Sequence, residues 1–520
     1  MHNNNPLNRR AFLGLSLAGT AAAALAACSP AAPDAARILP GDPLIAEYES
    51  RRVSSGKVVN QSLDAAPVAA ALNGRAITTW GYNGALQAPT IRASVGDQLK
   101  ATIKNGLGEA TSIHWHGLAL RNNADGVHGL TEDGTPAGGE HLYDFKLPHP
   151  GTYWYHSHVE MQRERALYGA LIIEDPQEPL DYHRDWVIVL DDWIDGVATK
   201  DGAATTPDEV MKELSGGMGG MDHGSMGHGS TGSGPMPMGN TLMGAVSEYL
   251  GGDAGDVATP FHLFNGATSE DPAVFVAKAG ERIRLRIINA AGDTAYRVGL
   301  PGQRITLTHS DGFPVKHEEV DAVVLGMGER IDALVTVQEG TTPVLALAEG
   351  KRQLVHGLIS TGTGTGTGTP PLPASLPMEL GGTVLDGGKL TADPAVVLAA
   401  RTPDRVHEMR LTGGMEKYDW GINGHRFDMA KPFERTFDIR AGERVQLAFI
   451  NDTDMWHPMH LHGHTFQIGE AGARKDAVIV RPGETVTVQF DADNPGQWLT
   501  HCHNAYHAER GMMAVVSYIA

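Results

Sequence analysis

Three segments of the chain repeat one pattern, and this repeat limits the folds that the chain can form. The segments are VGDQLKATIKN (95–105), AGERIRLRIIN (279–289) and AGERVQLAFIN (441–451). Each starts with Gly and an acid, alternates apolar and polar residues, and closes on an Asn nine residues after the Gly. Such alternation indicates a β-strand with one buried face, and the Gly-acid pair suits the turn before it. Three copies therefore predict three related β-domains.

Length, composition and charge agree with this organisation. The 520 residues exceed what one ordinary core holds. The 64 glycines and the aromatic content of 6% favour short strands joined by turns. The formal net charge of -20 argues against a nucleic-acid partner, because phosphate backbones attract the opposite sign. We expect a multidomain all-β protein.

The N-terminus has the features of an export signal. Arg9 and Arg10 precede a short apolar run that ends in small residues before Cys28. This predicts a Tat-type lipoprotein signal over residues 1–28, with Cys28 as the lipidated residue that anchors the protein to a membrane of the cell envelope or periplasm. The alternatives are a plain signal that is cleaved elsewhere and a membrane span, for which the run is short and rich in Ala. With Cys28 lipidated, the mature protein keeps one thiol, Cys502, and forms no intramolecular disulfide.

The repeat and the composition together predict the domain limits. We expect a flexible tether at 29–58 and a linker at 361–395, where Gly, Thr and Pro dominate. A segment at 211–243 is rich in Gly, Ser, Met and His and is expected to be an insert in the middle domain. The predicted domains are domain one at 59–180, domain two at 181–360 and domain three at 396–520.

Four His-x-His pairs occur in the outer two domains. Alternate side chains of a strand share a face, so the two imidazoles of each pair lie about 6–7 Å apart on one side. The repeat aligns HWHG with HLHG and HSH with HCH, whereas domain two carries Val298 and Leu300 in place of the first pair. If domains one and three pack by pseudo-symmetry, eight imidazoles converge at their interface, which suits a cluster of Cu, Zn, Fe or Ni ions. The pairs are His114/His116, His156/His158, His460/His462 and His501/His503.

The same alternation turns Cys502 away from that cluster. Cys502 lies between His501 and His503, so its sulfur points to the opposite face. His457, His507 and Met512 are placed to join it, and two His, one Cys and a weak axial Met form the ligand set of a blue-copper site. Met513 is the alternative axial ligand.

The four segments HWHG, HSH, HPMHLHGH and HCHNAYHAERGMM resemble those of multicopper oxidases, from about residue 60 to the end of the chain. The resemblance implies three cupredoxin-like Greek-key β-sandwich or barrel domains and four copper ions. It also implies one-electron oxidation of donors coupled to reduction of O2 to water. The implied ligands are His457, Cys502, His507 and Met512 for the type 1 copper, His114 and His460 for the type 2 copper, and His116, His156, His158, His462, His501 and His503 for the two type 3 coppers.

The resemblance also suggests where protons enter. Asp125 stands where similar enzymes keep an acid near the cluster. Some cuprous oxidases carry Glu directly after the second blue-copper His, but this chain has Ala508 there and Glu509 next. We hypothesise that Glu509 or water takes over that step. His464 shares the side of His460 and His462, and we expect it to be an outer hydrogen-bonding group or exposed.

The insert suggests the substrate. Thioethers favour Cu(I), and the insert resembles the methionine-rich segments of copper-tolerance oxidases. Donors are expected to be Cu(I) or small phenols, and the protein is expected to be a monomer. The alternatives are a copper-sequestering envelope lipoprotein and, less favoured, an enzyme similar to copper nitrite reductase. Accessory Cu(I) ligands are predicted at Met218, Met221, His223, Met226, His228, Met236 and Met238.

Overall fold

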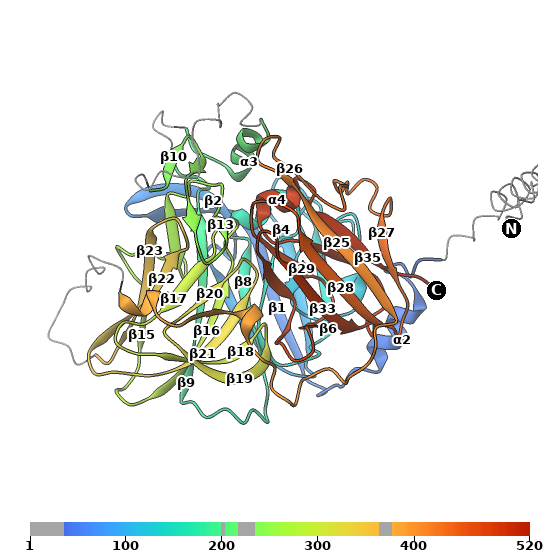
Figure 1. Cartoon of the computed structure of the whole chain (residues 1–520), viewed down its shortest axis with the longest axis horizontal. Coiled ribbons are helices and arrows are strands. Elements are labelled where there is room, and N and C mark those ends of the chain that lie inside the picture. The colour runs from blue at the N-terminus through green and yellow to red at the C-terminus, as the bar shows by residue number, and fades with distance from the viewer. Residues whose placement is uncertain (1–35, 199–202, 217–233, 363–376) are drawn as a thin grey trace, which may run out of the picture.

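The structure, a computed structural model, describes residues 36–198, 203–216, 234–362 and 377–520 (Figure 1). These residues form mostly β-strands with a few short helices, as the sequence predicts. The predicted signal with Cys28 lies outside the described residues. So do five of the predicted accessory Cu(I) ligands, Met218, Met221, His223, Met226 and His228. In the described part of the chain, no helix has the length and apolar character needed to cross a membrane.

Domain one contains two four-stranded sheets around one core. One sheet has the order β2-β1-β4-β6 and the other β3-β8-β7-β5. Leu99, Ile103 and Trp115 are among the side chains buried between them. The strands are β1 Val58–Leu72, β2 Arg75–Tyr82, β3 Ala88–Ser94, β4 Gln98–Asn105, β5 His114–His116, β6 Glu140–Lys146, β7 Gly151–His156 and β8 Tyr168–Glu174.

Domain two contains two six-stranded sheets, β14-β9-β16-β21-β18-β19 and β15-β23-β22-β17-β20-β24. Val298 and Leu300, which replace a histidine pair, are fully buried in its core. The strands are β9 Arg184–Trp193, β14 Phe261–Phe264, β15 Val274–Val276, β16 Arg282–Asn289, β17 Tyr296–Gly299, β18 Ile305–Ser310, β19 Phe313–Val320, β20 Ala322–Leu325, β21 Arg330–Thr336, β22 Thr341–Ala348, β23 Gln353–Ser360 and β24 Val384–Asp386.

Domain three repeats the two-sheet arrangement with the orders β26-β25-β28-β33-β30-β31 and β27-β35-β34-β29-β32. In Figure 1 it lies to the right in orange and red, and domain two lies to the left. Its strands are β25 Arg405–Gly414, β26 Asp419–Ile422, β27 Thr436–Ile439, β28 Arg444–Asn451, β29 His457–Leu461, β30 Phe466–Ile468, β31 Arg474–Lys475, β32 Ala477–Val480, β33 Thr485–Asp491, β34 Gln497–Cys502 and β35 Met513–Tyr518.

The repeated segment has the same place in each domain. It forms β4, β16 and β28. Each of these strands pairs parallel with the strand of its sheet that comes first in the sequence, and antiparallel with a later strand. The Gly of each copy has a positive φ between 81° and 85°, which other residues rarely adopt. The closing residue, Asn105, Asn289 or Asn451, is buried and donates its amide to two backbone carbonyls. The repeat thus conserves a turn and a buried hydrogen-bond pattern.

Short elements differ from the predicted tether and linker. Asp42 caps helix α2 (Pro43–Ser50), and Ile38 and Ile45 are buried in the core of domain three, so this part of the predicted tether is packed. Within the predicted linker, β24 pairs with β20 of domain two. Both segments are held against the domains because burial of their apolar residues stabilises the packed position. The other short elements are η1 Asn122–Ala124, η2 Glu160–Glu164, α3 Pro207–Ser215, β10 Met236–Met238, β11 Thr241–Met243, β12 Val246–Ser247, β13 Gly252–Asp253, η4 Met378–Gly381, η5 Gly387–Lys389 and α4 Ala505–Glu509.

Candidate metal centres

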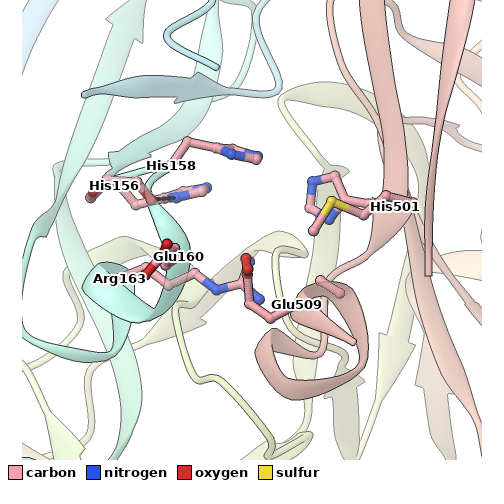
Figure 2. Close-up of a pocket in the computed structure, with 9 residues that line it drawn as sticks. His156, His158, Glu160, Arg163, His501 and Glu509 are labelled. Carbon is pink, nitrogen blue, oxygen red and sulfur yellow. Dashed lines mark hydrogen bonds between the residues drawn. The ribbon is translucent and has the colours of Figure 1, made fainter. Parts of the chain in front are cut away.

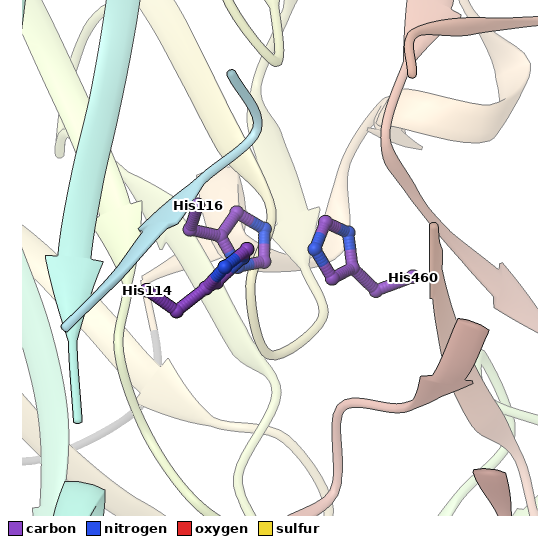
Figure 3. A group of neighbouring side chains, drawn as sticks. All are labelled: His114, His116 and His460. Carbon is purple, nitrogen blue, oxygen red and sulfur yellow. The ribbon is translucent and has the colours of Figure 1, made fainter. Parts of the chain in front are cut away.

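The eight paired histidines meet between domains one and three. Antiparallel pairing of β5 with β7 sets His114 opposite His156, and pairing of β29 with β34 sets His460 opposite His501. The two strand pairs face each other by an approximate two-fold relation. His114 stacks on His462 with 3.8 Å between ring centroids. His116 stacks on His460 with 3.9 Å between ring centroids, and Figure 3 shows these two rings facing each other. This is the convergence that the repeat predicted.

The imidazoles form groups of the size that a metal ion needs. His116, His156 and His503 form one group and His158, His462 and His501 another, each with ligand atoms within 4.8 Å of one another. His114 and His460 come together in a further group, beside His116. These groups match the division into type 3 and type 2 ligands that the resemblance implies. The ligand roles themselves remain a prediction.

Hydrogen bonds fix which nitrogen is free in four of the eight rings. His114 Nδ1 lies 2.9 Å from the carbonyl oxygen of Asp125, and His460 Nδ1 lies 2.7 Å from that of Asp476. His156 and His501 each place Nδ1 2.8 Å from the carbonyl of the following residue. In each case Nδ1 carries the hydrogen and Nε2 keeps its lone pair, the arrangement that metal-binding histidines use. Among the eight rings, the buried nitrogens without a hydrogen-bond partner are Nε2 of His114, His156, His158 and His460 and both nitrogens of His116 and His503.

Two buried aspartates reach across the interface in equivalent ways. The Asp125 carboxylate lies 2.9 Å from His462 Nδ1, so an acid of domain one holds a ring of domain three. The Asp476 carboxylate lies 3.0 Å from His116 Nε2, so an acid of domain three holds a ring of domain one. Asp125 therefore lies where the sequence places it, in contact with the histidine cluster.

Burial favours the neutral form of five cluster histidines. It lowers the pKa of His156, His158, His462, His501 and His503 well below the ordinary value, and neighbouring rings lower it further. A neutral imidazole offers a lone pair, and several such rings in one place favour binding of metal cations. The donor set therefore fits copper.

The second centre lies in domain three. The Cys502 sulfur lies 3.6 Å from His457 Nδ1 and 3.9 Å from His507 Nδ1, and the two nitrogens are 3.2 Å apart. The remaining ring nitrogens are held by Thr453, at 2.8 Å from His457, and by Asp256, at 3.1 Å from His507. Burial raises the pKa of the Cys502 thiol to about 12. Thiolate formation at neutral pH therefore needs a cation, and a soft metal such as copper supplies it.

The structure separates the two candidate axial methionines. Met512 is fully buried in the same core cluster as Cys502, whereas Met513 packs in another cluster with Val127, Leu499 and Ala508. We predict that Met512→Leu raises the reduction potential of the blue site, since the axial ligand tunes this potential. Redox titration of the thiolate absorption measures it. Met513→Leu is the control, and an equal shift in that variant would instead favour Met513 as the ligand.

A small cavity lies beside the predicted type 3 histidines. His158 and His501 line it together with Arg163 and Glu509, and a larger cavity of about 390 Å³ adjoins it. In Figure 2, His156 and His158 point toward His501, with Arg163 and Glu509 beside them. Burial raises the pKa of Glu509 to about 7, against the opposing effect of Arg163. Glu509 thus lies where the proton-relay hypothesis needs it.

Some contacts confirm or correct the roles expected of single residues. His464 is buried and bonds Tyr518, so it is an outer hydrogen-bonding group and the expectation of an exposed residue is wrong. Sequence reasoning missed Asp256, Asp476 and Arg330. Asp476 follows His460 by 16 residues whereas Asp125 follows His114 by 11. No shared spacing could therefore have revealed their equivalence.

Comparison with known proteins agrees with the geometry. Three family models, each described as multicopper oxidase, match residues 65–178, 241–361 and 400–519. The chain is 42% identical to the multicopper oxidase MmcO of Mycobacterium tuberculosis, over 98% of this chain and 97% of that protein. It is 29% identical to a copper resistance protein A homolog of Pseudomonas syringae pv. tomato, over 86% and 90% of the two chains. The solved laccase of Botrytis aclada superposes with a TM-score of 0.70 at 22% identity, over 91% of this chain and 89% of that one.

Proposed function

Because the chain belongs to the multicopper oxidase family and is a copper-dependent oxidoreductase, we propose that its physiological donor is Cu(I) and that it serves copper tolerance. The relatives named copper resistance protein A support this role. Small phenols are the second donor class, supported by the laccase relatives. Both donors deliver single electrons, and O2 accepts four.

The residues around each centre would divide the work. When bound, four copper ions, one type 1, one type 2 and two type 3, would supply one-electron storage and O2 reduction. His457, Cys502, His507 and Met512 would hold the first ion, and the eight paired histidines would hold the other three. Because His501 and His503 flank Cys502, the backbone joins the two centres covalently. Asp125 and Glu509 are the proposed proton carriers, and their positions beside the histidines support this.

The hairpin of β10 and β11, at the C-terminal end of the insert, supports the Cu(I) proposal. The backbone N–H of Leu242, in β11, donates to the carbonyl of Asp256 at 2.8 Å, and the Asp256 carboxylate contacts His507. In the hairpin of β10 and β11, Met236 lies opposite Met243, and strand alternation puts Met238 on the same face. Met236 and Met238 are 51% and 37% exposed. Soft thioethers therefore stand in solvent on a hairpin that is bonded directly to the wall of the electron-entry site, which suits capture of Cu(I).

Methionine replacement in the insert tests the donor. We expect the combined change of Met218, Met221, Met226, Met236 and Met238 to Leu to lower kcat/KM for Cu(I) about tenfold, which is roughly 1.4 kcal/mol in transition-state stabilisation. Leucine keeps the apolar volume and removes the sulfur. Oxidation of a phenol should stay within about twofold, because phenols need no thioether. O2 uptake with each donor measures both values.

The control is Met378→Leu, which changes a methionine that is 89% exposed and lies outside the insert. Equal loss of Cu(I) and phenol oxidation in the insert variant would contradict the proposal. Copper uptake without O2 consumption in the unaltered protein would support copper sequestration instead.

The proposal also covers the location of the protein in the cell and its oligomeric state. The sequence of residues 1–28 supports export by the Tat route and a lipid on Cys28, which would keep the oxidase at the cell envelope. An oxidase held there would meet copper that enters the cell. We propose a monomer, since each site is built from one chain. The domain limits at 59–180, 181–360 and 396–520 remain part of this proposal.

A further inference from the structure

Arg330 of domain two joins all three domains next to the histidine cluster. Its side chain is fully buried. Nε donates to the Thr152 carbonyl of domain one at 3.1 Å, and Nη1 donates to the Gly328 carbonyl of its own domain at 3.0 Å. Nη1 and Nη2 donate to the two carboxylate oxygens of Asp476 in domain three at 2.7 and 2.6 Å. The guanidinium therefore fixes the plane of the Asp476 carboxylate, as bidentate pairs do.

Asp476 in turn contacts predicted ligands of two different copper ions within the cluster. Its carboxylate lies 3.0 Å from His116 Nε2, and its backbone carbonyl lies 2.7 Å from His460 Nδ1. His116 is predicted to bind a type 3 copper and His460 the type 2 copper. Because Asp476 lies against both rings, its position limits the direction in which His116 presents Nδ1.

The approximate two-fold relation shows that Arg330 is an addition to one side. Asp125 makes the equivalent contacts, with its carbonyl to His114 and its carboxylate to His462. Among the described residues, however, Asp125 has no ion pair with Lys or Arg, whereas Asp476 has the pair with Arg330. The cation comes from the domain that supplies no histidine to the cluster.

Two glycines pack closely against the ion pair and the cluster. A Cβ atom on Gly117 would lie 2.3 Å from Arg330 Nη2 and 2.7 Å from an Asp476 oxygen. A Cβ atom on Gly328 would lie 2.9 Å from Cδ2 of His503 and 3.0 Å from Cε1 of His116. The backbone of domain two thus lies directly against the cluster, and the HWHG glycine makes room for the ion pair.

We propose that Arg330 is a positioning residue of the trinuclear copper site, acting through Asp476 on His116 and His460. Domain two is thereby part of the site although it supplies no histidine to the cluster. The inference rests on the copper-ligand assignments above and is independent of the donor. If the Arg330–Asp476 pair merely joined the domains, its loss would lower the stability of the protein and leave copper binding unchanged.

The copper affinity of the Arg330→Lys variant tests this proposal. Lysine keeps the charge and loses the fork of donors. We expect its cluster copper affinity to fall about 10- to 100-fold, the usual effect of losing a group that orients a metal ligand. Competition with a chelator, copper content per chain and the EPR signal of the type 2 copper measure the loss. The thiolate absorption of the blue site should remain.

The matched control is Arg481→Lys. Arg481 pairs with Asp386 at 2.5 Å between the same two domains and contacts no predicted ligand. We expect it to lower the melting temperature of the copper-free protein without changing copper affinity. Full copper affinity in Arg330→Lys, or equal losses in both variants, would overturn the proposal. If the Arg330→Lys variant does not fold, the copper affinity of Asp476→Asn, which keeps the side-chain shape, tests the same proposal.

Discussion

Replacement of Cys502 by Ser is expected to stop electron delivery from every donor. Oxidase activity should fall by about three orders of magnitude or more, equivalent to roughly 4 kcal/mol in the barrier. The reason is that no other sulfhydryl is predicted in the mature chain, and a serine hydroxyl does not ionise in a site whose burial already raises the pKa of the thiol to about 12. His457 and His507 alone then hold copper poorly at this centre.

O2 uptake with Cu(I) and with a phenol measures the effect, and the optical spectrum should lose its thiolate band. The copper content should fall by one ion per chain, because the eight cluster histidines are unchanged. Ser157→Cys is an informative companion, since Ser157 holds the equivalent place in domain one. It should create no second thiolate band, because domain one lacks counterparts of His457 and His507. Activity within about tenfold of the unaltered protein in Cys502→Ser would refute the predicted electron path.

Asp125→Asn should slow the reaction with O2 while leaving electron entry intact. We expect kcat to fall about 10- to 100-fold, as is usual when a group that orients a metal ligand is altered. The Asp125 carboxylate holds His462 Nδ1 at 2.9 Å, and an amide keeps the shape but loses the charge and the capacity to carry a proton. The Asp125 carbonyl, which holds His114, is not changed by the substitution.

Stopped-flow measurement separates the two half-reactions. Anaerobic bleaching of the blue site by a donor should keep its rate, whereas reoxidation by O2 should slow. Asp97→Asn is the control, because Asp97 is a buried acid of domain one that contacts Ser55 and Ser94 and no predicted ligand. It should change the melting temperature alone. Equal reoxidation rates in Asp125→Asn and the unaltered protein would exclude the proton role.

Strand periodicity accounts for how much of the site could be predicted. A residue and its second neighbour share a face, so His501 and His503 had to point together and Cys502 had to point away. The repeat then identified domain three as the partner of domain one. It also showed that domain two has Val298 and Leu300 in place of the first histidine pair. The structure has all of these side chains in the predicted places.

Groups that reach the site from elsewhere in the chain could not be predicted in this way. Asp256, Asp476 and Arg330 come from loops or strands whose local sequence contains no signal, and their roles depend on how three domains pack. The choice between Met512 and Met513 also needed the fold. Neighbouring residues of an extended chain face opposite cores, and only the packed structure shows which core contains Cys502.

The sequence alone therefore determined three β-domains, the eight histidines of one cluster and the separate direction of the single buried sulfur. Each of these follows from local alternation and an internal repeat. The tertiary structure alone decided which carboxylates hold those rings, and that a cation from the domain without ligands fixes one of them. The physical reason is that hydrogen bonds and ion pairs between domains depend on distances in space, which the order of residues along a strand does not specify.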